Sequence, residues 1–158
     1  MLKILISALL LSSGVAYAAG PVMSCDKEYT AEVLKPGFVT VTGRDGKSSR
    51  VRIGHHIDGG SFSRDDGYLV LYGIPAKTSP QTPQTNYLTL YRLGHQPKTV
   101  VRRDYGAGIY SADFSADGKF VAVTTRLGVD ILDVTKITFE SHDPAYTPQF
   151  PLQACDKQ

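Results

Sequence analysis

The chain has 158 residues, of which 17 are basic and 15 acidic, giving a formal net charge of +2, and 42% of the residues are hydrophobic. The basic residues form no block and are not interleaved with aromatic residues, which argues against a nucleic-acid partner. At this length a single domain with one core is the natural organisation.

The first 18 residues, MLKILISALLLSSGVAYA, have the layout of a secretory signal peptide. Lys3 precedes an apolar run over residues 4–11, and Ala16 and Ala18 favour cleavage after residue 18. The run is shorter than the ~20 residues of a membrane-spanning helix. We expect export and a mature chain of residues 19–158 with no membrane contact; a retained N-terminal anchor is the alternative.

Two cysteines, Cys25 and Cys155, lie near the two ends of the mature chain. In an exported protein an even pair of cysteines predicts a disulfide. Free thiols, metal ligation and lipidation of Cys25, which follows a faint lipoprotein-like VMS box, are the alternatives. No CxxC or HxxxH spacing supports a metal site, so we expect neither a metal nor a cofactor.

Short alternating runs bounded by Gly, Pro, Asp and Asn fill the rest of the chain, which is typical of an all-β domain. The first predicted hairpin joins residues 38–42 to residues 49–53 through GRDGKS. Further strands are predicted at residues 68–74, 87–93, 98–102, 109–115, 119–125, 129–133 and 137–140.

One phrase occurs twice, as FSRDDGYLVLY from Phe62 and as FSADGKFVAVTT from Phe114. Each phrase begins a copy of four successive strands, at about residues 59–103 and 109–140. An Asp-Gly turn joins the first strand of each copy to the second, where a tight hairpin needs residues that tolerate positive φ. Phe62 and Phe114 are therefore expected at equivalent buried positions.

The repeated phrase resembles the blades of WD40-like and TolB-like β-propellers, whose period is about 40–50 residues. A closed propeller needs at least ~4 blades, and the mature chain supplies about three, with residues 38–53 as part of the third. We expect an incomplete propeller-like assembly of antiparallel four-stranded sheets, with the disulfide holding its ends. Two unrelated hairpins in a β-sandwich are the alternative.

Candidate catalytic residues have structural explanations. His55 and His56 are adjacent, so on a strand they would point to opposite faces and could not easily share a metal. Asp65, Asp66 and Asp117 lie in the repeated turns, where aspartate is favoured for local hydrogen bonding. There is no GxSxG nucleophile motif. We expect a protein that is not an enzyme; a small hydrolase with an unrecognised site is the alternative.

The segment PAKTSPQTPQTN, residues 75–86, interrupts the predicted hairpin between residues 68–74 and 87–93. It is polar, nearly uncharged and stiffened by three prolines. Long insertions on a β scaffold often carry binding, and a passive surface loop is the alternative. The residues expected to bind a partner are Lys77, Thr78, Ser79, Gln81, Thr82, Gln84, Tyr72 and Tyr87.

Taken together, the signal peptide, the early and late cysteines, the Ser-x-Asp-Gly blade turns and the length resemble periplasmic immunity proteins of type VI secretion systems. The resemblance is to those that neutralise peptidoglycan amidase effectors with a short propeller-like fold. It implies a protein that binds and blocks a cell-wall-degrading toxin, and no motif is carried over residue by residue. A non-catalytic propeller-like binding module of the cell envelope is the alternative.

Overall fold

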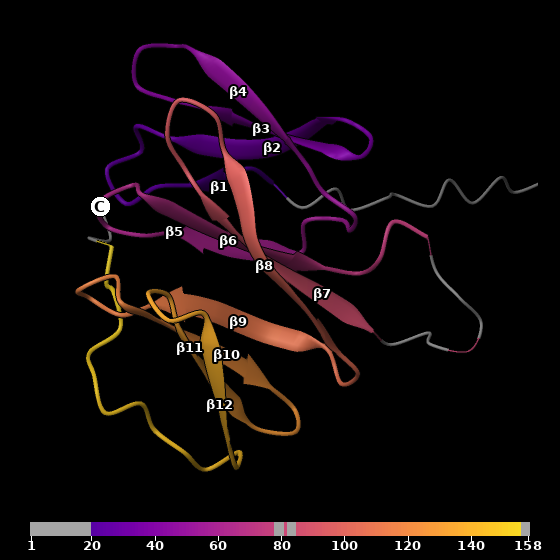
Figure 1. Cartoon of the computed structure of the whole chain (residues 1–158), viewed down its shortest axis with the longest axis vertical. Helices are drawn as coiled ribbons and strands as arrows, with labels where there is room; N and C mark the ends of the chain where they lie inside the picture. Colours follow the sequence, from indigo (N-terminus) through magenta and orange to yellow (C-terminus); the bar gives the residue numbers. More distant parts are fainter. Residues whose placement is uncertain (1–19, 78–80, 82–84, 156–158) are drawn as a thin grey trace, which may run out of the picture.

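The computed structural model describes residues 20–77, 81 and 85–155, which form strands and connections without a helix. The strands make three antiparallel four-stranded sheets in chain order (Figure 1). Sheet 1 contains β1 (Val22–Met23), β2 (Thr30–Lys35), β3 (Phe38–Thr42) and β4 (Ser48–Arg52). Sheet 2 contains β5 (Gly59–Phe62), β6 (Tyr68–Gly73), β7 (Asn86–Arg92) and β8 (Lys98–Tyr105). Sheet 3 contains β9 (Ile109–Phe114), β10 (Phe120–Thr125), β11 (Val129–Asp133) and β12 (Thr138–His142).

The predicted fold class is confirmed, since the protein is all-β and its sheets form an open, propeller-like stack. Sheets 2 and 3 are the two predicted copies. Sheet 1 goes beyond the prediction, because β1 and β2 precede the expected hairpin of β3 and β4. Half of the β2 sequence, TAEVLK, consists of residues that are depleted in strands (Ala, Glu and Lys), and β1 has only two residues, so neither gives a strand pattern.

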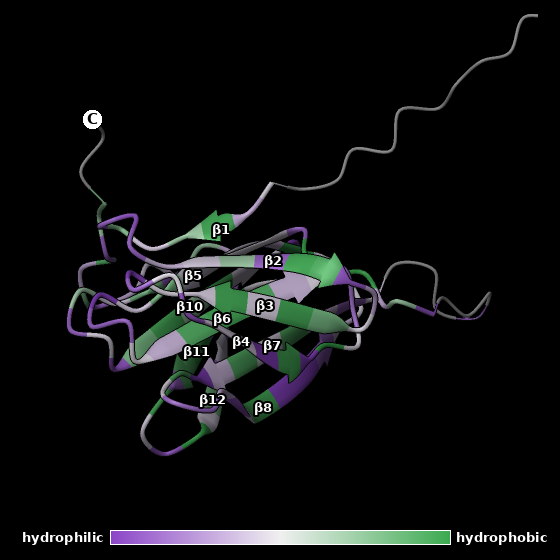
Figure 2. Ribbon diagram, turned by 90° about the horizontal axis from the view of Figure 1, so that it is seen from above, coloured by the Kyte–Doolittle hydropathy of each residue, from purple (hydrophilic) through white to green (hydrophobic). Residues whose placement is uncertain are grey.

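Sheet 2 lies between the other two sheets and is buried on both faces. Leu69 and Leu71 of β6 pack into the core shared with sheet 1, whereas Val70 packs into the core shared with sheet 3. Successive strand residues point to opposite faces, which explains the unbroken apolar run of β6. In Figure 2 the strands carry most of the apolar residues and the connections most of the hydrophilic ones.

Phe62 and Phe114 occupy equivalent places, as predicted. Each ends the first strand of its sheet, each is 1% exposed, and each lies in a core between two sheets. The innermost strands also contact one another, and the Ser61 hydroxyl of β5 donates a 2.8 Å hydrogen bond to the Ala112 carbonyl of β9. The repeated phrase therefore corresponds to a repeated structural unit.

The same turn joins the first and second strands of all three sheets. A serine hydroxyl donates to the aspartate two residues later, at 2.5 to 2.7 Å, and accepts from the backbone N–H five residues later, at 2.9 to 3.0 Å. The serine–aspartate pairs are Ser24 and Asp26, Ser63 and Asp65, and Ser115 and Asp117.

The position after the aspartate has a positive φ in each turn: Lys27 at 63°, Asp66 at 53° and Gly118 at 71°. In both predicted copies the residue with positive φ belongs to the expected Asp-Gly turn, as its Asp66 in the first copy and as its Gly118 in the second. Aspartate tolerates this conformation through local hydrogen bonding, and lysine does so less readily. Without a glycine, the turn at Ser24 was not recognised in the sequence.

The C-terminal segment, residues 143–155, covers the outer face of sheet 3. The Phe150 ring stacks on the Phe120 ring at 5.1 Å between centroids, and Tyr146 packs against the same cluster. Further along, the Gln153 N–H donates to the Phe114 carbonyl at 2.8 Å. The segment occupies the place beside sheet 3 where a closed propeller would have its next blade.

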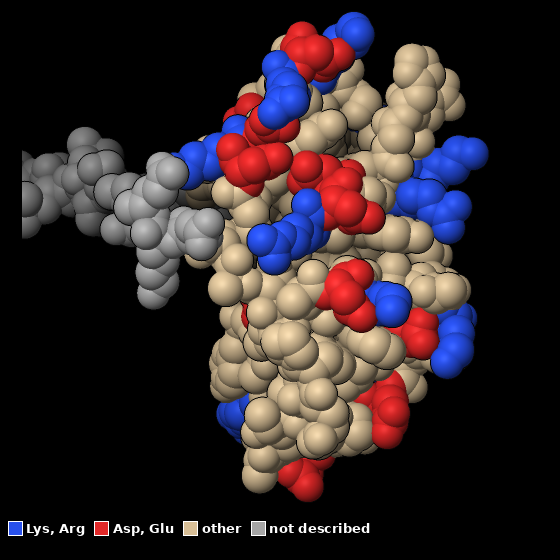
Figure 3. Space-filling view, turned by 90° about the vertical axis from the view of Figure 1, so that its left-hand side faces the viewer, with Lys and Arg blue, Asp and Glu red and all other residues tan. Residues whose placement is uncertain are grey.

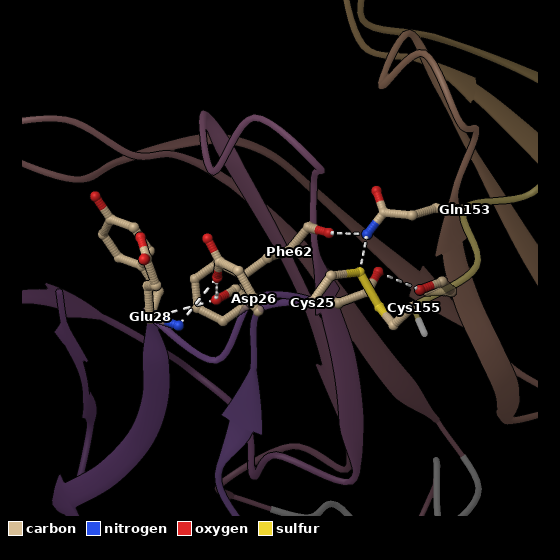
Figure 4. The surroundings of a disulfide bond; sticks show 10 residues. Cys25, Asp26, Glu28, Phe62, Gln153 and Cys155 are labelled. Atoms are coloured by element: carbon tan, nitrogen blue, oxygen red, sulfur yellow. Dashed lines mark hydrogen bonds between the residues drawn. A yellow bond between two sulfur atoms is a disulfide. The ribbon is translucent and has the colours of Figure 1, made fainter. Parts of the chain in front are cut away.

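Cys25 and Cys155 form the predicted disulfide, with their Cα atoms 4.9 Å apart and a separation of 130 residues in the sequence (Figure 4). The Gln153 side-chain amide lies beside the bond, donating to the Phe62 carbonyl at 3.1 Å and lying 2.9 Å from the Cys25 sulfur. The disulfide thus ties the first turn of sheet 1 to the end of the C-terminal segment. Within the described ranges, no helix has the length and apolarity needed to cross a membrane.

Candidate functional site

The insertion leaves the molecule at the end opposite the serine–aspartate turns. Because β6 begins at the turn after Phe62 and ends at Gly73, its two connections lie at opposite ends of the sheet. Figure 1 shows the serine–aspartate turns on the left and the ends of β6 and β7 on the right. We call the right-hand end the insertion end.

The stem of the insertion, residues 72–76, is held by the linker between sheets 1 and 2, residues 54–58. Backbone N–H groups of His56 and Asp58 donate to the carbonyls of Ile74 and Tyr72, both at 2.8 Å. The Ala76 N–H donates to the Gly54 carbonyl at 3.0 Å. Residues 54–58 therefore continue the pairing of β6 beyond the sheet and fix the direction in which the chain departs.

Glycines permit this close approach. A Cβ atom on Gly73 would lie 2.1 Å from the His56 carbonyl oxygen, and one on Gly59 would lie 2.4 Å from the Tyr72 hydroxyl. Contacts this short do not occur for real Cβ atoms. At Gly73 the neighbour is backbone, so the linker reaches the stem there only because this position lacks a side chain, whereas a side chain at Gly59 would displace the Tyr72 side chain. The paired glycines at residues 59–60 were the available sequence signal for this contact.

His55 is a buried structural residue of the stem. Its Nδ1 lies 2.6 Å from the His56 carbonyl, which can only accept, so Nδ1 carries the proton and Nε2 accepts from the Thr89 hydroxyl at 2.9 Å. Burial lowers the pKa of His55 and keeps the ring neutral. His56 is exposed, so the two histidines do not act as a pair.

Three tyrosines surround the stem. The Tyr72 hydroxyl donates to the Tyr110 carbonyl at 3.1 Å, and burial raises the Tyr72 pKa. The Tyr87 ring meets the His55 ring edge-on at 6.5 Å. Tyr110 is 63% exposed and was not among the expected binding residues; its position at the start of β9 brings it to this end.

The structure places the expected binding residues as follows. Tyr72 and Tyr87 are half-buried at the stem, and Lys77 and Gln81 are exposed. The remaining four, Thr78, Ser79, Thr82 and Gln84, lie outside the described residues. Two other tyrosines of the same region, Tyr91 and Tyr105, are buried in the cores and present no surface for a partner.

The opposite end is highly charged (Figure 3). Lysines pair there with the aspartates of the turns, as in Lys119 with Asp117 at 3.5 Å and Lys136 with Asp133 at 3.3 Å. A cavity of about 730 Å³ opens at this end between sheets 1 and 2, with Asp66 in its lining. Burial, with the nearby carboxylates of Asp26 and Asp65, raises the pKa of Asp66 to about 6.

Among the described residues, no group of three or more His, Cys, Asp or Glu side chains is arranged to hold a metal ion. At the charged end, Asp26, Asp65 and Asp117 are engaged in turn hydrogen bonds. The insertion end combines a braced stem with tyrosine side chains, which suits binding of another macromolecule.

The architecture is an open, propeller-like assembly, and a solved β-propeller structure shares this fold. The β-propeller domain of Cps50 (Swd1) from Myceliophteria thermophila matches with a TM-score of 0.53 at 14% identity, over 78% of this chain and 40% of that chain. The dihydro-heme d1 dehydrogenase NirN in complex with DHE matches with a TM-score of 0.33 at 15% identity, over 80% of this chain and 37% of that chain. This structural similarity is too low to support a shared fold.

The chain thus spans about two fifths of the length of these structures, and the first of them supports the fold alone. No family model matches the sequence, and no curated protein matches it.

Proposed function

We propose that this protein is a periplasmic immunity protein that binds and blocks a cell-wall-degrading toxin of the peptidoglycan amidase type. The observation that carries the proposal is the braced stem: an insertion of a dozen residues departs from a strand end that a second segment holds by backbone hydrogen bonds. A segment that blocks an enzyme cleft has to be presented from such a fixed base.

The composition of the insertion supports the same function. Its three prolines restrict the unbound chain, which reduces the entropy lost on docking. Its single charge, at Lys77, limits the desolvation cost inside a cleft. The tyrosines at the stem add contact area with polar ends.

The disulfide-linked architecture supports the periplasmic location. A bond between residues 130 positions apart joins the two ends of the sheet stack, and such bonds persist in oxidising compartments. The N-terminal sequence supports export independently.

The gene neighbourhood supplies the test. The proposal predicts an adjacent gene for a peptidoglycan amidase, and the purified product of that gene is assayed on isolated peptidoglycan with increasing amounts of this protein. A variant with residues 77–85 replaced by a short Gly-Ser linker should inhibit at least tenfold less, about 1.4 kcal/mol, with an unchanged thermal unfolding curve.

The matched control replaces residues 94–97, a turn at the charged end, with the same linker. It should inhibit as the wild type does. Full inhibition by the insertion variant would show that the insertion is passive, and binding without inhibition would favour the envelope binding module.

A further inference from the structure

Each sheet exposes a large aliphatic side chain near the connection between its second and third strands. These side chains are Leu34, Ile74 and Leu127, exposed to 67%, 44% and 70%. The three connections lie at the same end of the molecule, the insertion end, on the right in Figure 1. The apolar residues thus repeat with the sheets and flank the stem on both sides.

An exposed basic residue accompanies each of them: Lys35, Lys77 and Arg126. Within the described part of the chain, none of these three forms a salt bridge; at the charged end the lysines at positions 47, 119 and 136 are paired, and Lys27, Arg64 and Lys98 are not. The insertion end therefore places three basic side chains without a salt-bridge partner near apolar ones, while the Asp58 carboxylate accepts from the Ile74 N–H at 3.1 Å. We call Leu34, Lys35, Ile74, Lys77, Arg126 and Leu127 the rim.

We propose that the rim is a second contact surface, which docks against a protein. The binding cleft of that protein is bordered by carboxylate side chains and has separate apolar patches within this border. This proposal rests on the proposed function, since the rim surrounds the stem of the inhibitory insertion. The basic side chains would meet carboxylates at the border, and complementary charge of this kind accelerates association and selects the partner. The apolar side chains would be buried at contacts on either side of the insertion.

A folded protein fits this arrangement better than a lipid surface. The aliphatic side chains stand singly on separate connections, with half-buried tyrosines between them, whereas a membrane-binding surface has a continuous apolar face. A rigid cleft border can match separated points.

Site-specific photo-crosslinking in the producing cell tests the rim and captures the protein that it contacts. A benzophenone side chain is placed in the full chain at position 34, at position 127 or, as a control, at the exposed position 96 of the charged end. We expect the same single protein to be attached from positions 34 and 127 and not from position 96, with mass spectrometry giving its identity.

Charge reversal provides the second readout. Lys35→Glu combined with Arg126→Glu should reduce the yield of this adduct at least tenfold, whereas Lys98→Glu at the charged end should leave it unchanged. The proposal that the rim docks against a protein would be wrong if no adduct formed or if all three positions gave equal adducts. It would also be wrong if the adduct yield did not depend on the rim charges.

Two outcomes separate the rim from its alternatives. If the attached protein meets these criteria but does not degrade peptidoglycan, the rim stands and the proposed function fails. If the wild type sediments with phosphatidylglycerol vesicles and the charge-reversed variant does not, the surface binds membranes and the protein-docking proposal is wrong.

Discussion

In each sheet, a serine side chain stabilises the turn between the first and second strands by hydrogen bonds within that turn. In the turn of sheet 3, the buried Ser115 hydroxyl donates to Asp117 at 2.7 Å and accepts from the Phe120 N–H at 3.0 Å. The hydroxyl therefore acts both as a donor and as an acceptor, so this buried polar group is satisfied. Three turns with these contacts orient three sheets alike, which explains why the phrase is repeated in the sequence.

Asp66 makes the stability of this turn system depend on pH. Burial and neighbouring carboxylates raise its folded-state pKa to about 6, above the value of 3.8 for an unperturbed aspartate. The folded state therefore binds the proton more tightly, and the stability this group contributes is fully present below pH 4 and lost as pH rises through 6. Asparagine removes the charge and also tolerates the φ of 53°.

We accordingly expect Asp66→Asn to be more stable than the wild type at pH 7.5, by an advantage that shrinks toward pH 4. Urea unfolding midpoints at both pH values measure it. Asp45→Asn is the matched control: the hydrogen bond with Lys47 lowers the Asp45 pKa, so its removal should lower the midpoint at pH 7.5. An Asp66→Asn variant less stable than the wild type at pH 7.5 would contradict the account.

Among the elements, the C-terminal segment takes the place of a missing blade. Its Phe150 ring stacks on Phe120 of sheet 3, and both side chains are partly buried. Phe150→Ala should lower the free energy of unfolding by about 1–2 kcal/mol, less than the 3–5 kcal/mol of a fully buried phenylalanine. Urea unfolding at neutral pH measures the difference.

Gln149→Ala is the control for this substitution, because Gln149 is exposed beside Phe150. It should change the unfolding free energy by less than about 0.5 kcal/mol. Equal effects of the two substitutions would mean that the segment does not stabilise sheet 3.

The elements that the sequence predicted correctly are those whose own residues determine their structure, and the elements that it missed depend on contacts with distant segments. Sheets 2 and 3 were predictable because their strands alternate or are continuously apolar, and because their turns contain glycine. β2 was missed because its strand is fixed by pairing with β3 and not by its own composition. The stem was predicted only as two separate loops, since the contact between His56 and Ile74 depends on how sheets 1 and 2 stack.

At the scale of the whole molecule, the disulfide substitutes for closure of the ring. Sheet 1 and the C-terminal segment are the two ends of the stack, and the bond between Cys25 and Cys155 joins them. In the chain-entropy model a loop of this length contributes ~4–5 kcal/mol. The Cys25→Ser, Cys155→Ser double variant should lose about that much in urea unfolding.

Wild-type protein in reductant should match the double variant, which serves as its control. Identical midpoints for oxidised and reduced wild-type protein would show that the stack holds without the bond.

The molecule as a whole has two unlike ends, one with paired charges and one with the braced insertion and the rim. Hydrogen exchange of the full mature protein, alone and with the amidase that the proposed function predicts in the adjacent gene, tests most directly that the insertion end is the binding end. The account predicts slower exchange on binding at residues 54–58, 72–77 and 126–128, with no change in the serine–aspartate turns at residues 63–67 and 115–119. Protection confined to those turns, or no protection anywhere, would contradict it.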